Sequence, residues 1–228
     1  MKTEKLNYIH HSEKRDLRTF YSNLRKGLGE AVRKEKSAAI TKHILSMDTV
    51  IDSNVVMAYY SIGSEVDTFH LMRDIIKSNR SLVLPYCLDN KEMGIARIYN
   101  LESDVEKGPF GTIQPKREFW GNIGIEKIGA CICPGVAFDS YGTRLGRGGG
   151  FYDNFLCRLK LKSKAAIIGC CFECQIHGLS SSPLPRESHD VSMDFVVSEN
   201  GSSKFEGDDL HGIGCQMTLA DKLFIDRD

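Results

Sequence analysis

The feature that most constrains this sequence is a glycine-rich segment between an apolar run and a helical pattern. Four of the five residues from 146 to 150 are glycine. An apolar run at 128–133 precedes the segment, and the apolar residues of 155–159 behind it recur at helical spacing. Strand, glycine loop and helix in this order are typical of layered α/β proteins with parallel strands.

The same alternation continues along most of the chain. Helical patterns begin after Ser12 and Asp67, both possible N-caps, and a third helical pattern covers 38–45. Strand-like runs occupy 55–60, 81–84 (stopped by Pro85), 95–99, 128–133, 165–171 and 193–197. We therefore expect a three-layer α/β/α fold with a largely parallel sheet.

The length of 228 residues is enough for one sizeable core. After Glu199 the composition turns to Gly, Ser, Asp and Lys. We predict a single domain over 1–199 and a C-terminal tail over 200–228, which we expect to be mobile.

Thirty basic residues balance thirty acidic ones, so no overall charge attracts nucleic acid or a membrane. The apolar runs are far shorter than the ~18 residues of a membrane span. Residues 1–14 lack the charged and apolar pattern of a signal peptide. We predict a cytoplasmic protein, a monomer or weak dimer, without nucleic-acid or membrane partners.

Most of the eight cysteines lie in apolar, strand-like runs, where a buried thiol behaves as a small hydrophobe. Cys171 and Cys174 form one CxxC pair, and Cys131 and Cys133 could share a strand face. Without a second CxxC pair, a tetrahedral zinc site is the minor alternative.

The glycine segment fits neither the P-loop, which needs Lys and then Ser or Thr, nor the dinucleotide motif, which needs Gly where Phe151 stands. Its glycines still allow close approach of an anion to backbone N–H groups at a helix start. Arg144 and Arg147 can bind phosphate oxygens. The pattern favours an oligophosphate site over the alternative, a turn with two solvated arginines. Asp153, in the first helical turn, either complements the helix dipole or binds Mg²⁺ beside phosphates.

Residues 134–153, PGVAFDSYGTRLGRGGGFYD, closely resemble the signature of the 5-formyltetrahydrofolate cyclo-ligase family, also called methenyltetrahydrofolate synthetases. The resemblance extends to Lys14 and Arg18, and to 61–68, Pro85, 110–115 and 185–194. It implies a fold similar to the sugar-phosphate isomerases, with ATP and folate meeting over the carboxyl ends of the strands. It also implies the Mg²⁺- and ATP-dependent conversion of 5-formyltetrahydrofolate to 5,10-methenyltetrahydrofolate, with release of ADP and phosphate.

The resemblance also implies a role for individual residues. ATP would contact Lys14, Arg18, Arg144, Gly146, Arg147, Gly148, Gly149 and Gly150. The folate substrate would contact Glu65, Phe110, Gln114 and Tyr152; Mg²⁺ would bind Asp153 and Asp190; and Arg147 and Tyr152 would act in catalysis. Lys14 and Arg18 could instead belong to a solvated helix face, Phe110 could be a loop anchor in the core, and Asp190 could be a turn residue.

The chain departs from the family pattern at three places. Phe151 replaces the first of a usual pair of tyrosines, Gly149 stands where many relatives have Lys, and the tail has no counterpart. Two other functions therefore stay open. One is a diverged, non-catalytic folate- or nucleotide-binding protein, and the other is a sugar-phosphate isomerase on the related fold.

Overall fold

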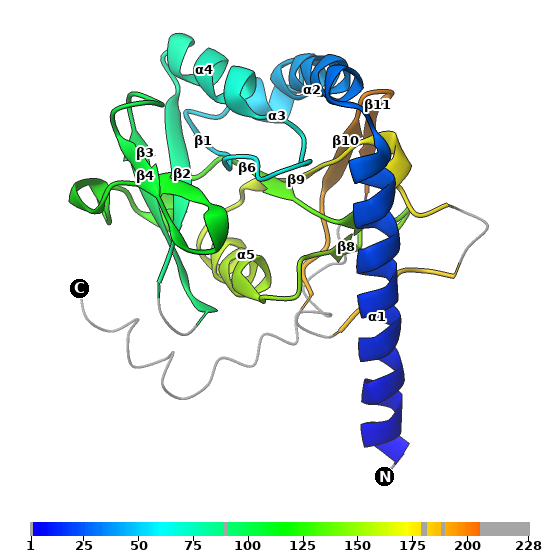
Figure 1. The fold of residues 1–228 in the computed structure, drawn as a ribbon. Helices are drawn as coiled ribbons and strands as arrows, with labels where there is room; N and C mark the ends of the chain where they lie inside the picture. Colours follow the sequence, from blue (N-terminus) through cyan, green and yellow to red (C-terminus); the bar gives the residue numbers. More distant parts are fainter. Residues whose placement is uncertain (1, 89–90, 179–181, 188–189, 206–228) are drawn as a thin grey trace, which may run out of the picture.

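The structure is a computed structural model that describes residues 2–88, 91–178, 182–187 and 190–205, with side chains from Ser12 onward. Its centre is a seven-stranded sheet in the order β11-β10-β9-β6-β1-β2-β3 (Figure 1). The strands are β1 (Val55–Met57), β2 (Ser81–Cys87), β3 (Met93–Ile98), β6 (Ala130–Pro134), β9 (Ala166–Cys170), β10 (Phe195–Ser198) and β11 (Gly201–Lys204). The five inner strands are parallel, and the two edge strands, β3 and β11, are antiparallel to their neighbours.

Helices cover both faces of this sheet (Figure 1). The helices are α1 (Lys2–Gly27), α2 (Glu30–Leu45), α3 (Asp48–Ile51), α4 (Phe69–Lys77) and α5 (Phe151–Lys162). Successive strand residues point to opposite faces, so Val56 packs with α2, α3 and α4, whereas Met57 packs with α5. The predicted three-layer fold with a largely parallel sheet is confirmed.

Two small hairpins, which the strand patterns did not predict, stand outside the main sheet. β4 (Val105–Lys107) and β5 (Ile113–Pro115) are joined by a 3₁₀ turn at Pro109–Gly111. β7 (Ala137–Phe138) and β8 (Arg144–Leu145) lead into the glycine loop. Further 3₁₀ turns lie at Arg117–Phe119, Ile125–Lys127 and Glu173–Gln175.

Several predicted boundaries differ from the structure. Thr68 and not Asp67 is the N-cap of α4, although Oδ1 of Asp67 accepts a hydrogen bond from the Phe69 N–H group at 2.9 Å. Ser12 is not an N-cap, because α1 already begins at Lys2. Pro85 does not end β2, which continues to Cys87. Because β1 pairs only with residues 81–83, β2 has a single neighbouring strand at Pro85, and the missing N–H group of proline is tolerated there. Beyond Glu199, β11 adds a strand to the sheet, and 206–228 of the predicted tail lie outside the described residues.

The strand order creates a topological switch point. From β1 the chain moves outward to β2 on one side, and later to β6, β9 and β10 on the other. The loops that leave the carboxyl ends of β1 and β6 therefore diverge, which opens a crevice of the kind where doubly wound proteins bind ligands. Within the described residues, no helix is both long enough and apolar enough for a bilayer span.

Candidate active site

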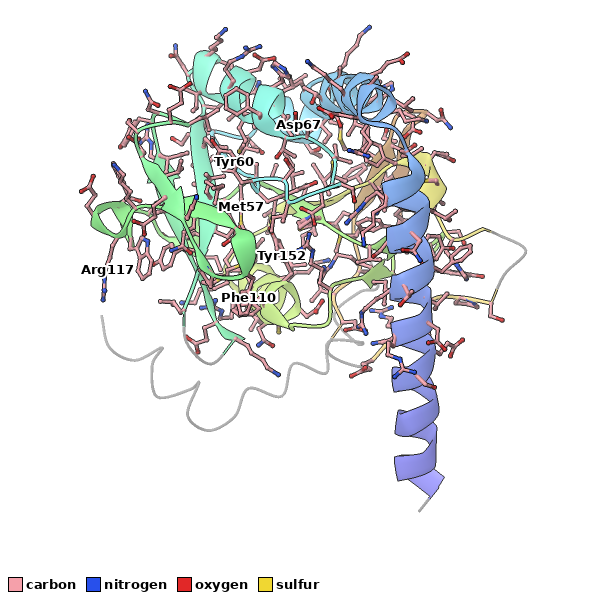
Figure 2. The ribbon with its side chains drawn as sticks, viewed as in Figure 1. Met57, Tyr60, Asp67, Phe110, Arg117 and Tyr152 are labelled. Carbon is pink, nitrogen blue, oxygen red and sulfur yellow. The ribbon has the colours of Figure 1, made fainter. Side chains whose placement is uncertain are left out.

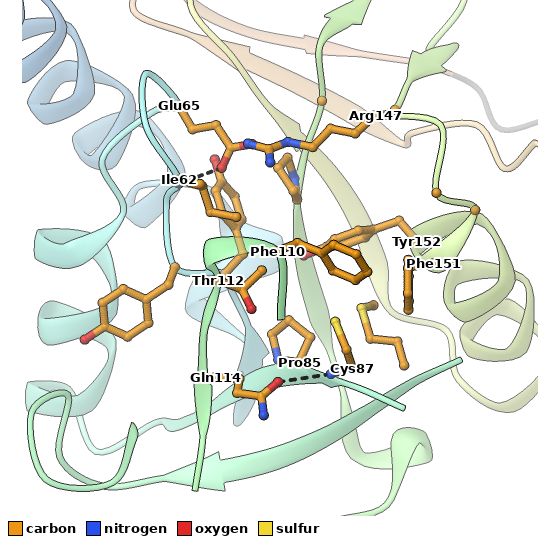
Figure 3. Close-up of a pocket in the computed structure, with 18 of the residues that line it drawn as sticks. Ile62, Glu65, Pro85, Cys87, Phe110, Thr112, Gln114, Arg147, Phe151 and Tyr152 are labelled. Atoms are coloured by element: carbon orange, nitrogen blue, oxygen red, sulfur yellow. Dashed lines mark hydrogen bonds and ion pairs between the residues drawn. The ribbon is translucent and has the colours of Figure 1, made fainter. Parts of the chain in front are cut away.

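A cavity of about 380 Å³ lies at this switch point (Figure 3). Its wall is formed by the loop after β1, the ends of β2 and β6, the β4–β5 hairpin and the glycine loop. The predicted site residues in this wall are Glu65, Phe110, Gln114, Arg144, Gly146, Arg147, Gly148, Gly149, Gly150, Tyr152 and Asp153. Apart from Lys14 and Arg18, which are not in this wall, the predicted nucleotide and folate residues thus face one shared space.

The glycine loop joins β8 to α5 with backbone conformations that suit glycine. Gly148 has φ of +94° and Gly150 has φ of +76°, both in the left-handed region. Gly150 is the N-cap of α5, so backbone N–H groups of the first helical turn border the cavity. Arg18 of α1 donates from Nε to the Gly146 carbonyl at 2.8 Å and holds the loop from behind.

Arg144 is fixed beneath the loop, with only 4% of its side chain exposed. Its Nη2 donates to Oδ1 of Asp153 at 2.5 Å, and its Nη1 donates to the Pro134 carbonyl at 3.3 Å. Burial disfavours the charged guanidinium, but Asp153 more than offsets this, so the pKa of Arg144 is raised. The structure therefore holds a permanent positive charge at the base of the loop.

Arg147 instead reaches from the loop to Glu65, which lies in the loop after β1 (Figure 3). Its Nη2 is 2.8 Å from Oε1 of Glu65, and the other carboxylate oxygen accepts a hydrogen bond from the Ile62 N–H group at 2.9 Å. The Glu65 side chain is 6% exposed and that of Arg147 is 50% exposed. This ion pair joins a predicted nucleotide residue to a predicted folate residue.

Phe110 stands at the tip of the β4–β5 hairpin, next to Tyr152 (Figures 2 and 3). It is 77% exposed and contacts Phe151 edge to face, with ring centroids 6.1 Å apart. Its φ of +59° is unusual for a bulky residue. The alternative that Phe110 anchors the loop in the core is wrong, since the ring is held at the cavity instead.

Gln114 lies in β5, where the cavity wall meets β2. Its side chain is buried, and its Oε1 accepts a hydrogen bond from the Cys87 N–H group at 3.3 Å (Figure 3). The amide is thereby fixed in one orientation at the cavity.

Among the residues that the structure describes, neither the buried Tyr152 hydroxyl nor the buried Nε of Arg144 has a hydrogen-bond partner. Burial, with Cys133 and other acidic groups nearby, raises the pKa of Tyr152 well above its ordinary value, so the phenol is neutral at physiological pH. Unpartnered buried polar atoms are rare in native proteins. Both atoms belong to residues of the cavity wall, although the atoms themselves are covered by neighbouring protein atoms.

Lys14 and Asp190 lie outside the cavity wall and contact each other. Nζ of Lys14 is 3.1 Å from Oδ2 of Asp190 and 2.8 Å from Oε1 of Glu187. Of the two predicted metal ligands, Asp153 therefore lines the cavity and Asp190 does not. No three His, Cys, Asp or Glu side chains within the described ranges form a metal-binding group. Asp153 still fits Mg²⁺, because Mg²⁺ at such sites takes one or two carboxylates and otherwise phosphate oxygens and water.

Arg25 is a buried residue near the site that the sequence analysis missed. It is 6% exposed, and its Nε donates to Oγ of Ser64 at 3.1 Å, beside Glu65. Burial lowers the pKa of Arg25, although the Glu65 charge opposes this effect. Arg25 follows Arg18 by seven residues, so the helical stripe of Lys14 and Arg18 could have indicated it.

Fold and site together define a doubly wound α/β protein with a glycine loop at the start of a helix and an aromatic cavity that contains an acid. The model of the 5-formyltetrahydrofolate cyclo-ligase family matches residues 10–199. The chain therefore belongs to the 5-formyltetrahydrofolate cyclo-ligase family.

Individual relatives agree with this assignment. The 5-formyltetrahydrofolate cyclo-ligase of Haemophilus influenzae is 26% identical over 79% of this chain and 95% of its own length. The mitochondrial enzyme of that name from Arabidopsis thaliana is 29% identical, over 83% of this chain and 75% of its own. The structure of Aquifex aeolicus 5,10-methenyltetrahydrofolate synthetase superimposes with a TM-score of 0.71 at 27% identity, over 90% of this chain and 99% of that one.

Proposed function

We propose that this chain uses Mg·ATP to convert 5-formyltetrahydrofolate to 5,10-methenyltetrahydrofolate, with release of ADP and phosphate. The observation that carries the proposal is the shared cavity, in which the glycine loop and Glu65 face each other and are joined by Arg147. Membership of the cyclo-ligase family supports it. The cytoplasmic location and the monomeric or weakly dimeric state stay predictions.

The triphosphate would lie along residues 146–150. The N–H groups at the start of α5 and the guanidinium of Arg147 supply hydrogen bonds and positive charge there. Arg144 adds a fixed charge below the loop, and Arg18 holds the loop in place. Lys14, one helical turn before Arg18, would reach the phosphates only after leaving its acidic partners.

The pterin would lie against Glu65 and the aromatic wall. A carboxylate accepts paired hydrogen bonds from the N–H groups of a pterin edge. Phe110 and Phe151 provide ring surfaces, and Gln114 a fixed amide, in the same cavity. This arrangement would bring the N5-formyl group near Tyr152 and the phosphate loop.

The reaction needs charge stabilisation more than a nucleophilic side chain. The formyl oxygen attacks the γ-phosphorus and ADP leaves; N10 then attacks the activated carbon, loses its proton, and the C–O bond breaks to release phosphate. Preorganised cations and backbone donors stabilise the transferring phosphoryl group. When bound, Mg²⁺ would neutralise phosphate charge, with Asp153 as its protein ligand.

A direct assay tests the proposal. The protein is mixed with Mg·ATP and 5-formyltetrahydrofolate, and the near-ultraviolet absorbance of the conjugated methenyl product is followed while ADP is measured. We expect both signals to rise together, and neither to rise when nucleotide or folate is omitted. Folate binding without ADP release would instead indicate a non-catalytic binding protein, and turnover of sugar phosphates without nucleotide would indicate an isomerase.

A further inference from the structure

We propose that the ion pair between Arg147 and Glu65 is exchangeable and couples the binding of the two substrates. Without nucleotide, Arg147 binds Glu65 and competes with the pterin for this acid. A bound triphosphate attracts Arg147 and frees Glu65. The inference rests on the proposed function, since it assigns nucleotide to the loop and folate to Glu65.

The two partners differ in freedom of movement. Arg147 is half exposed and has the length and rotatable bonds of an arginine side chain. Glu65 is nearly buried, and the Ile62 N–H group holds its second oxygen at 2.9 Å. The acid is therefore the fixed partner, and the guanidinium is the group that can move.

The movable partner lies where it blocks the acid. Figure 3 shows Arg147 extended from the glycine loop toward Glu65, at the cavity that both residues line. Both carboxylate oxygens are already engaged, Oε1 by Arg147 and Oε2 by Ile62. A pterin that hydrogen bonds to Glu65 must therefore displace the guanidinium or share the acid with it.

Glu65 keeps a second cation nearby when Arg147 moves away. Arg25 is buried on the α1 side, bonded to Ser64, and its charge interacts with those of both Glu65 and Arg147. A buried carboxylate that loses its last cation is strongly disfavoured. Arg25 thus leaves a positive charge close to Glu65 after Arg147 has moved to the phosphates.

Coupling of this kind is reciprocal and measurable. Nucleotide must tighten folate binding by the same factor by which folate tightens nucleotide binding. Allosteric couplings commonly amount to about fivefold or more in affinity. Because Arg147 is the competitor, its removal should strengthen folate binding in the absence of nucleotide, even though catalysis becomes slower.

Isothermal titration calorimetry of the full chain tests this. The dissociation constant of 5-formyltetrahydrofolate is measured with Mg²⁺ alone and with Mg²⁺ plus the non-hydrolysable analogue AMP-PNP. The variants are Arg147→Ala, Arg147→Gln as a length-matched version, and Arg73→Ala as a control. Arg73 is a partly exposed arginine of α4 that forms an ion pair with its neighbour Asp74 and does not line the cavity.

In wild type and Arg73→Ala, AMP-PNP should tighten folate binding about fivefold or more. In Arg147→Ala and Arg147→Gln, folate should bind more tightly than to wild type without nucleotide, and AMP-PNP should have little effect. Folate binding to wild type that is unaffected by AMP-PNP, or weaker nucleotide-free binding in both Arg147 variants, would overturn the exchange while leaving the proposed function intact. Absence of folate binding under every condition would overturn both.

Discussion

Two arginines three residues apart form ion pairs of opposite character. Arg144 is 4% exposed and bound to Asp153, whereas Arg147 is 50% exposed and bound to Glu65. Arg144 precedes the glycine loop in a β-strand, and Arg147 projects from the loop itself. The pairs thus share a chemistry and differ in burial.

This difference in burial decides which arginine can leave its ion pair. A buried guanidinium cannot leave its carboxylate without exposing an uncompensated charge to a poorly solvated interior. A half-exposed guanidinium can exchange a carboxylate for phosphate or water at smaller cost, because water screens the guanidinium and Arg25 leaves a positive charge near Glu65. We infer that Arg144 shapes the site and that Arg147 acts on ligands.

The largest predicted effect is on stability at the buried pair. Arg144→Met should lower the free energy of unfolding by about 3 to 5 kcal/mol, because Asp153 loses its partner. Arg147→Met should change it by less than about 1 kcal/mol. Urea unfolding of both variants measures the contrast, and equal losses would contradict the distinction. Adding Asp153→Asn to Arg144→Met should recover part of the loss.

The second predicted effect is on catalysis. Arg147, whose removal should hardly change stability, should matter strongly here. Arg147→Ala should lose about 2 to 4 kcal/mol of transition-state stabilisation, comparable with removal of one preorganised donor. Steady-state kcat/KM at saturating Mg·ATP measures it, with Arg73→Ala as the matched control. Wild-type kcat/KM in Arg147→Ala would exclude Arg147 from the chemistry.

The third prediction concerns whether Asp153, which is bonded to Arg144, also binds Mg²⁺. In Asp153→Asn one anionic Mg²⁺ ligand is lost, so the Mg²⁺ concentration for half-maximal activity should rise severalfold. The measurement is a Mg²⁺ titration at fixed ATP. The equivalent titration of Asp190→Asn shows whether that residue, bonded to Lys14 outside the cavity, also contributes. An unchanged titration for Asp153→Asn would remove it as a ligand.

A smaller effect is expected at Phe110, which is strained and exposed rather than buried. Phe110→Gly should raise the KM for folate about fivefold, which corresponds to the roughly 1 kcal/mol that an aromatic contact contributes. Its stability should not fall much, because glycine adopts the φ of +59° without strain and little buried surface is lost. Kinetics and urea unfolding are compared. A large stability loss with unchanged KM would make Phe110 structural.

The last predicted effect concerns a buried thiol beside Tyr59 in the core. Burial raises the pKa of the Cys170 thiol from 9.0 to about 12. Between these values the unfolded chain has lost the proton that the folded chain keeps, so stability should be complete below pH 9 and fall as pH rises toward 12. Urea unfolding at pH 8 and pH 10 should show the fall, and Cys170→Val should reduce it. A pH-independent unfolding free energy would contradict the assignment.

Much of the fold could be predicted because the chain alternates strand and helix patterns clearly. Hydrophobic period and glycine position predicted the layers and the placement of the loop between a strand and α5. The two hairpins were missed because their strands have only two or three residues, too few to show alternation. The extra strand β11, GSSK, lacks the apolar pattern of a strand because it is an edge strand, with three exposed residues.

The site could be predicted only in part. Residue types at the glycine loop indicated an anion site, and the family resemblance supplied Glu65 and Phe110. No pattern could show that Arg147 contacts Glu65, because 82 residues separate them in sequence. Nor could it show that Lys14 lies with Asp190 rather than at the cavity, since that depends on how α1 packs across the fold.

The most direct test is a crystal structure with Mg²⁺, AMP-PNP and 5-formyltetrahydrofolate bound together. The predicted result places the triphosphate against residues 146–150, with Arg147 on a phosphate, Glu65 on the pterin and Arg144 still on Asp153. A nucleotide bound away from the glycine loop, or a pterin that does not contact Glu65, would contradict the central claim.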